Sequence, residues 1–288
     1  MPLRSLSSSR TVATRLAVRA VAIALMASPL AACGFWDDDP GYKTQATDPP
    51  DLLYNQGLVA MKAGDYSKAS KRFESLDKQY PQTEWQKKAI LMMAYSNYTS
   101  GNYDDAITSS RRYVTLWPTD KDAAYMTYIW ANSQYKQIPD ITRDQDRASQ
   151  ALAGFQKVVT DYPKSEYVAD AKFKIQVVRD QLAGKEMEIG RFYQKQQNYT
   201  AAVNRYKAVV KDYAQTRQIE EALSRLTECY MALGLSSEAQ TAAAILGHNY
   251  PNSQWYKDAY TLVKSHGLEP REDTDSWLSR TFRSAITL

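Results

Sequence analysis

Along most of this chain, the small and apolar positions are arranged around five turn signals. At each signal an aromatic residue is followed by Pro, or once by Ala, and a Ser, Thr or Asp stands two places further on. The signals are Tyr80-Pro81-x-Thr83, Trp117-Pro118-x-Asp120, Tyr162-Pro163-x-Ser165, Tyr213-Ala214-x-Thr216 and Tyr250-Pro251-x-Ser253. Pro ends a helix, and the small polar residue can cap the N-terminus of the next. The pattern predicts a helix start at each polar position.

A second position is fixed relative to these signals, because a small residue lies twelve places before each Pro or Ala. These residues are Ala69, Ala106, Ala151, Ala202 and Ala239. Ala lets two helices approach closely, and a large apolar residue four places later, at Phe73, Phe155 and Tyr206, falls on the same helix face. Ser110 and Ala243 replace it in the other two repeats, where we expect looser packing.

Together these marks resemble the tetratricopeptide repeat, a pair of helices that stacks on its neighbours. The resemblance implies an all-α, right-handed solenoid of five helix pairs. The marks are 37, 45, 51 and 37 residues apart, against about 34 in the standard repeat. We assign one surplus to a polar loop, Lys136 to Arg147, and the other to a single long helix, Ser165 to Gln196, that joins the two halves. Gly184 within it would cost about 1 kcal/mol relative to Ala.

The predicted divisions follow from the same marks. The repeats cover about 51–82, 83–119, 120–164, 165–215 and 216–252, and a closing helix covers 253–264. A C-terminal extension, 265–288, carries apolar residues on one helical face at Trp277, Leu278, Phe282, Ala285 and Ile286. This amphipathic helix could cap the solenoid, bind a partner or lie on a membrane, and its low positive charge makes the membrane the least favoured choice.

The N-terminus indicates export and lipidation. Four arginines precede a short apolar run, Ala20 to Leu30, which is typical of a signal peptide over residues 1–32. Leu30-Ala31-Ala32-Cys33 has the form of a lipobox, so Cys33 is the predicted lipidation site and 33–50 the anchor and flexible tether. By resemblance to bacterial lipoproteins, Gly34 in place of Asp after Cys33 implies sorting to the periplasmic face of the outer membrane.

Charge and cysteine content narrow the function classes. Of 36 lysines and arginines, four lie in the signal segment, which leaves 32 to balance 32 acidic residues. A mature chain without a basic excess is not expected to bind nucleic acid. Once Cys33 is lipidated, Cys229 has no disulfide partner, and a buried position in a helix is its expected role.

No constellation for catalysis, a cofactor or a metal is found. The two histidines, His248 and His266, are expected at helix ends, and there is no Gly-rich phosphate loop or metal-ligand spacing. The carboxylate pairs Glu186/Glu188 and Glu220/Glu221 are interpreted as solvated helix faces. The chain is therefore predicted not to be an enzyme.

Binding of other polypeptides remains, since helical solenoids present extended surfaces for peptides and partner domains. Most of the 21 tyrosines are assigned to repeat packing. Tyr80, Tyr95, Tyr98, Tyr125 and Tyr128 are candidates for an exposed minority. The clamp that binds a chaperone's terminal carboxylate is not expected, because Tyr54 and Leu58 stand at its positions. An extended apolar or aromatic peptide fits better.

As a whole the chain resembles the BamD family, lipoproteins of the outer-membrane β-barrel assembly machinery. The resemblance rests on the lipobox, the five repeats, the insertion Arg143-Asp144-Gln145 and the long-helix stretch from Tyr162 to Tyr193. It implies docking to the POTRA domains of BamA, association with other Bam lipoproteins, and help in presenting unfolded outer-membrane proteins.

Individual residues follow from the same resemblance. In Ala202-Val203-Asn204-Arg205, Arg205 matches an Arg that pairs with a POTRA carboxylate, and Tyr80 matches an aromatic near the proposed substrate site, with Tyr95 and Tyr98 as further candidates. Two alternatives stay open at this point. One is another repeat lipoprotein that coordinates envelope growth, and the other is an accessory subunit of a peptidoglycan hydrolase.

Overall fold

The computed structural model describes residues 48–286, and in this range it contains twelve α-helices and no strand. The helices are α2 (Pro50–Lys62), α3 (Tyr66–Gln79), α4 (Glu84–Thr99), α5 (Tyr103–Leu116), α6 (Ala123–Tyr135), α7 (Asp146–Asp161), α8 (Val168–Lys195), α9 (Tyr199–Asp212), α10 (Ile219–Ala232), α11 (Ser236–Asn249), α12 (Gln254–Ser265) and α13 (Trp277–Ile286). Within this range no helix is long and apolar enough to cross a membrane. Cys33 and the other N-terminal features predicted above lie outside the described residues.

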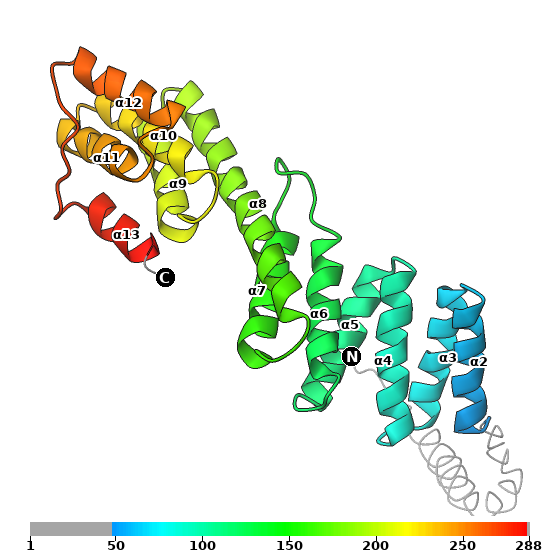
Figure 1. Ribbon diagram of the computed structural model, residues 1–288. Helices are drawn as coiled ribbons and strands as arrows, with labels where there is room; N and C mark the ends of the chain where they lie inside the picture. Colours follow the sequence, from blue (N-terminus) through cyan, green and yellow to red (C-terminus); the bar gives the residue numbers. More distant parts are fainter. Residues whose placement is uncertain (1–47, 287–288) are drawn as a thin grey trace, which may run out of the picture. The chain divides into compact units, whose positions relative to one another are not determined.

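From α2 to α11, each helix packs as an antiparallel neighbour of the next helix in the sequence (Figure 1). The helices thus form pairs, α2 with α3 being the first and α10 with α11 the last, and each pair packs on the next. The predicted all-α architecture of five tetratricopeptide-like pairs is confirmed, with α12 packed on the last pair. Among the first helices of successive pairs, α2 contacts α4, and α4 contacts α6. We call the surface formed by α4, α6, α8 and α10 the first-helix face.

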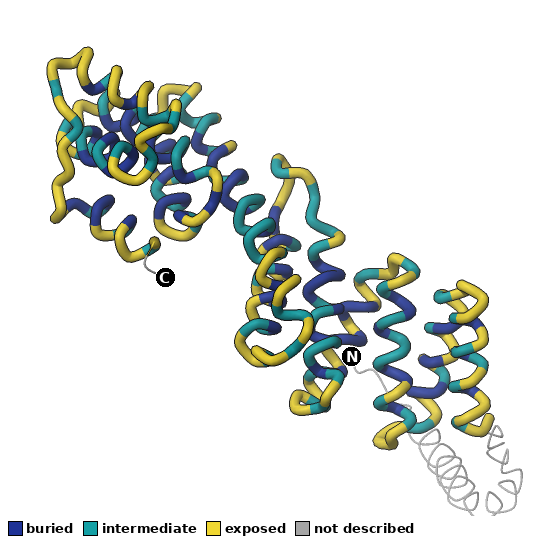
Figure 2. Tube along the Cα trace, in the orientation of Figure 1, coloured by how far each residue is buried: buried dark blue, intermediate teal, exposed yellow. Residues whose placement is uncertain are grey.

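The repeat alanines and the aromatic residues that follow them form the helix seams. All five alanines are completely buried, as are Phe73, Phe155 and Tyr206, and Figure 2 shows burial concentrated on the helix sides that meet. Glycines on the first helices make room for the rings. A Cβ at Gly57 would lie 2.5 Å from the Phe73 ring, and one at Gly190 would lie 2.4 Å from the Tyr206 ring.

The predicted long helix is confirmed as α8, which is 28 residues long. The insertion, whose loop runs from α6 to α7, folds back against it: Lys185 Nζ donates to the Thr142 carbonyl at 2.9 Å. Gly184 has a packing reason here, because a Cβ at this position would lie 2.6 Å from Ile141 Cδ1.

The prediction of a helix cap at every turn signal is only partly correct. Thr83 and Ser253 cap α4 and α12, with hydroxyls that accept from Gln86 N and Trp255 N. At Asp120, Ser165 and Thr216 the prediction is wrong, because a further turn follows and α6, α8 and α10 begin three residues later. Asp120 instead accepts from the Asp122 backbone N–H at 3.0 Å.

The positions that lack a large seam residue are nevertheless filled. Ser110 and Ala243 are completely buried. In the second repeat Tyr113 occupies the seam, buried against the ring of Trp117 with 5.2 Å between ring centroids. Ser110 Oγ has no hydrogen-bond partner among the described residues, which is an energetic cost of this substitution.

The C-terminal helix α13 packs against α9 and α11 (Figure 1). Its apolar residues Leu278 and Phe282 are buried in the core of the last repeats. The segment between α12 and α13 is held by a bond from the Asp273 backbone N–H to Thr241 Oγ1 at 3.1 Å. Of the three roles considered for this helix, packing on the helical repeats is the one that the structure displays.

Candidate interaction surfaces

Tyrosines of α6 and of the turn that leads into α8 meet on the first-helix face of the N-terminal repeats. Tyr128 on α6 stacks on Tyr167 at the start of α8, with 4.9 Å between ring centroids and 25° between ring planes. The Tyr125 ring lies 5.4 Å from the same Tyr167 ring. Burial raises the pKa of Tyr125, Tyr128 and Tyr167. These hydroxyls therefore stay protonated at neutral pH and can donate hydrogen bonds.

A polar network links α8 and α6 to α4. Lys174 Nζ, on α8, donates to Tyr128 Oη at 2.8 Å and to Asn132 Oδ1 at 2.9 Å. Asn132 Nδ2 in turn donates to Tyr98 Oη, on α4, at 2.7 Å. The ammonium also lies over the Tyr128 ring, 4.9 Å from its centroid. One part-buried lysine thus fixes the positions of tyrosines from neighbouring repeats.

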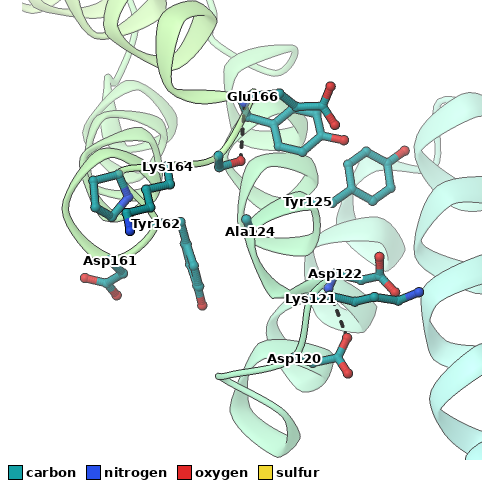
Figure 3. Close-up of a pocket in the computed structure, with 12 residues that line it drawn as sticks. Asp120, Lys121, Asp122, Ala124, Tyr125, Asp161, Tyr162, Lys164 and Glu166 are labelled. Carbon is teal, nitrogen blue, oxygen red and sulfur yellow. Dashed lines mark hydrogen bonds between the residues drawn. The ribbon is translucent and has the colours of Figure 1, made fainter.

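A pocket of about 560 Å³ opens beside these tyrosines, between the turn that precedes α6 and the turn that precedes α8. Figure 3 shows the rings of Tyr125 and Tyr162 on opposite sides of the small side chain of Ala124. Tyr162 Oη donates to the Pro118 carbonyl at 3.1 Å, so the two turns are directly linked. Rings at the walls and charged residues at the rim can accommodate an extended peptide segment.

The three tyrosines predicted as substrate contacts are not gathered into one site. Tyr80 packs in the α2–α3–α4 core cluster, Tyr98 packs in the next cluster, and the Tyr95 ring lies 6.3 Å from that of Tyr66. The expectation of an exposed minority is wrong for all five tyrosines named, including Tyr125 and Tyr128, since each is half-buried.

On the first-helix face of the C-terminal repeats, charged residues stand in place of tyrosines. Arg191 on α8 donates to Glu221 on α10 at 3.1 Å, and Arg225 donates to Glu228 at 2.8 Å. Burial disfavours the charge of Arg225, but its bonds to Glu228 and Glu221 outweigh this and raise its pKa. The interpretation of Glu221 as part of a solvated face is wrong, because its side chain is only 15% exposed and is paired with two arginines.

Arg205 lies on α9 at the edge of a hollow of about 270 Å³. Its Nη1 donates to Glu186 Oε2 at 3.2 Å, which also corrects the interpretation of Glu186 as solvated, and the Arg205 side chain is 42% exposed. Small side chains, Ala201 and Ala208, surround it. The remaining guanidinium donors have room to reach an acceptor from outside.

The structure also shows where the cysteine and the two histidines lie, for which no chemical role was predicted. Cys229 is buried in α10, and burial raises the pKa of its thiol to about 12. His248 lies in the last turn of α11, and His266 lies directly after α12. Among residues 48–286 no three His, Cys, Asp or Glu side chains are placed to hold a metal ion.

Comparison with known proteins supports the same architecture. The family model YfiO, described as an outer membrane lipoprotein, matches residues 46–246. The outer membrane protein assembly factor BamD of Caulobacter vibrioides is 40% identical over 250 residues, which cover 87% of this chain and 82% of that protein. BamD of Rickettsia prowazekii is 42% identical over 218 residues, which cover 76% of this chain and 87% of that protein.

Among solved structures, the TPR2AB domain of yeast Sti1, described as a complex with pHSP90, covers 76% of this chain and 85% of its own length. Its TM-score is 0.39 at 15% identity, so it carries no argument about function. The curated relatives do, because their similarity is high and extends over most of both chains. The chain therefore belongs to the BamD family of outer membrane protein assembly factors and is, like them, a non-catalytic protein associated with the outer membrane.

Proposed function

We propose that this protein is a lipid-anchored scaffold at the periplasmic face of the outer membrane that docks BamA through its POTRA domains. The observation that supports this docking best is the geometry of Arg205. Its guanidinium is held at the edge of an open hollow by a single carboxylate. A carboxylate of a partner can therefore bind the remaining donors without displacing a core contact.

The repeat itself supplies a matched control. Arg72 and Arg205 both lie three residues after the repeat alanine, Ala69 in α3 and Ala202 in α9. We expect Arg205→Glu to weaken binding of purified POTRA domains about tenfold to a hundredfold, whereas Arg72→Glu leaves it unchanged. Equal binding by the two variants would remove Arg205 from the interface.

The anchor is a separate part of the proposal. Cys33 is the residue proposed to carry the lipid, with outer-membrane sorting by Gly34. A Cys33→Ser variant should incorporate no palmitate and should leave the membrane fraction for the soluble periplasmic fraction. Retention of the label by this variant would place the modification elsewhere.

We further propose that the tyrosine-rich first-helix face receives segments of unfolded outer-membrane proteins, with Tyr95 and Tyr98 of α4 among the contacts and Tyr80, at the end of α3, as an additional contact outside this face. The stacked rings around Tyr167 and the adjoining pocket support this role. A labelled peptide from the C-terminal segment of a barrel substrate should lose affinity when Tyr95 and Tyr98 are both replaced by Ala. The same change at Tyr260, on α12, is the control.

Proteins that are recovered with this chain from solubilised membranes separate the assembly role from the alternative functions. Recovery of a barrel protein with periplasmic domains from solubilised membranes supports the assembly role. Recovery of peptidoglycan hydrolases in its absence would support an accessory subunit of cell-wall enzymes instead, and would reject the docking proposed here.

A further inference from the structure

A second hollow, of about 510 Å³, lies between the last turn of α9 and the C-terminal helix α13. Lys211 and Asp212 line it from α9, and Trp277, Arg280 and Thr281 line it from α13. No standard helix pair contributes this second wall, because α13 follows the last repeat and the helix that closes it. The hollow is therefore a feature of the C-terminal extension.

The two helices that form it are strongly basic. Together α9 and α13 carry five cations against one anion, Asp212. The cations are Arg205, Lys207, Lys211, Arg280 and Arg283. Two are already paired, Arg205 with Glu186 and Arg283 with Glu272.

Of the remaining three cations, Lys211 and Arg280 line the hollow, and Lys207 lies beside it against Trp277. The Lys207 ammonium lies over the Trp277 ring, 3.9 Å from its centroid, which attracts the charge without neutralising it. Lys211 and Arg280 are exposed at the rim and form no ion pair with another residue of the described chain. The rim thus carries two cations, Lys211 and Arg280, against one acidic residue, Asp212, so that a net positive charge remains.

This hollow continues the surface on which Arg205 lies. Ala208 lines the Arg205 hollow and Lys211 lines the second one. Three residues along a helix amount to about 4.5 Å, less than one turn, so the two hollows follow one another on the same side of α9. A single extended segment can contact both.

We propose that α13 and the last turn of α9 form a docking groove for an acidic segment of the protein partner that Arg205 contacts. This inference rests on the function proposed above, and it assigns Lys211 and Arg280 as carboxylate-binding residues. Charge complementarity identifies the segment as acidic, and α13 becomes one wall of the interface.

A membrane surface explains these observations less well. Insertion of an amphipathic helix into lipid requires a free apolar face, whereas Leu278 is completely buried and Phe282 is 2% exposed. Lipid binding would have to pull both side chains out of the core of the last two repeats. Among the described residues of α13, the one exposed large apolar side chain is Ile286, at its end, and Trp277 is partly buried.

The test compares charge reversals in the full-length, lipidated protein in detergent. Binding of the purified periplasmic domains of the barrel partner is measured for Lys211→Glu/Arg280→Glu and for the control Arg72→Glu/Lys257→Glu, which changes the same charge at exposed sites elsewhere. We expect the first double variant to bind about tenfold or more weakly, with a shallower dependence on salt, and the control to bind normally. The neutral variant Lys211→Gln/Arg280→Gln should also bind more weakly while its thermal melting is unchanged, which would confirm that the loss of binding is electrostatic.

Each contrary outcome has a defined meaning. If Arg205→Glu weakens binding but the Lys211/Arg280 variant does not, the groove is not part of the interface and the proposed docking stands. If the unmodified protein does not bind the periplasmic domains, the proposed docking fails, and this inference fails with it. Loss of binding to vesicles containing phosphatidylglycerol, with protein binding intact, would assign the groove to lipid and overturn the inference.

Discussion

The N-terminal and C-terminal repeats share one backbone plan but differ in what their first helices present. In α6 and at the start of α8, tyrosines from successive repeats contact each other, and a single lysine, Lys174, bonds to Tyr128 and is linked through Asn132 to Tyr98 on α4. In the second part of α8 and in α10, arginines and glutamates alternate instead, from Arg191 to Glu228. The seam alanines are the same in both regions.

This difference separates what the repeat requires from what it leaves open. Ala at the seam is a packing requirement that recurs in all five pairs, and a ring four residues later fills the seam in three of them. The outward positions of the first helices are not constrained in this way. Their divergence fits a protein that binds an aromatic or apolar segment with one half and a charged domain with the other.

The largest expected effect concerns the shared seam. Phe155→Ala and Tyr206→Ala should each lower the free energy of unfolding by about 3 to 5 kcal/mol, because both rings are completely buried. Denaturant titration followed by circular dichroism measures the change. A loss below about 1 kcal/mol in one half would show that its seam is not the equivalent packing unit.

The second prediction concerns the turn before α6, where the contribution of Asp120 to stability should depend on pH. Asp120 accepts bonds from Lys87, from Tyr113 Oη and from the Asp122 backbone N–H. Burial alone would raise its pKa, but these bonds outweigh burial and hold the pKa at about 2. Because this is below the value in the unfolded chain, the ionised carboxylate stabilises the fold above about pH 4 and ceases to do so as the pH falls through about 2.

Asp120→Asn should therefore cost on the order of 2 kcal/mol at pH 7, and the difference from the unmodified protein should shrink below pH 4. Denaturant titrations of both proteins at pH 7 and at pH 3 measure this difference. Asp275→Asn, in the segment before α13, is the control with an exposed carboxylate. A difference that stays constant down to pH 3 would mean that the bonds to Asp120 do not depend on its charge.

The tyrosine network around Lys174 and the arginine–glutamate network around Arg225 should lose different amounts of stability when their cation is removed. Lys174 Nζ also pairs with Asp170 Oδ2 at 2.8 Å. Lys174→Met leaves this partly exposed carboxylate able to reach solvent, and we expect a cost of about 1 to 2 kcal/mol. Arg225→Met leaves the mostly buried Glu221 with one arginine fewer, so its cost should be as large or larger. Thermal melting of both variants in low and high salt would show whether the C-terminal network is the more salt-sensitive.

The smallest effect separates the two seam rings. Tyr206 Oη donates to Gln194 Oε1 at 2.8 Å, whereas Phe155 has no hydroxyl. Tyr206→Phe should cost about 1 kcal/mol, since Gln194 keeps a second contact with Glu228. A cost near that of Tyr206→Ala would mean that the hydroxyl, and not the ring, holds the seam.

The sequence was most informative where structure is local. The spacing of Ala202 from Ala214 and the helical period from Ser165 to Gln196 predict a helix pair and a long helix, and both are present. Helices expected to start directly after Asp120, Ser165 and Thr216 start two residues later, because the same polar residue can begin an extra turn instead of a helix.

Contacts between distant residues were not predictable in this way. Glu221 pairs with Arg191, which lies 30 residues earlier on another helix, and no periodicity within α10 reveals it. The network from Lys174 through Asn132 to Tyr98 depends on how three helices are stacked. Nor could the pattern decide whether α13 caps the repeats, since its apolar face fits several partners.

Site-specific crosslinking in growing cells tests the division between the two halves most directly. A photoreactive residue is placed at Arg205 in one strain and at Tyr125 in another, and the captured proteins are identified. The account predicts capture of BamA from the position of Arg205 and of unfolded outer-membrane proteins from the position of Tyr125. Capture of the same proteins from both positions, or BamA from Tyr125 alone, would contradict it.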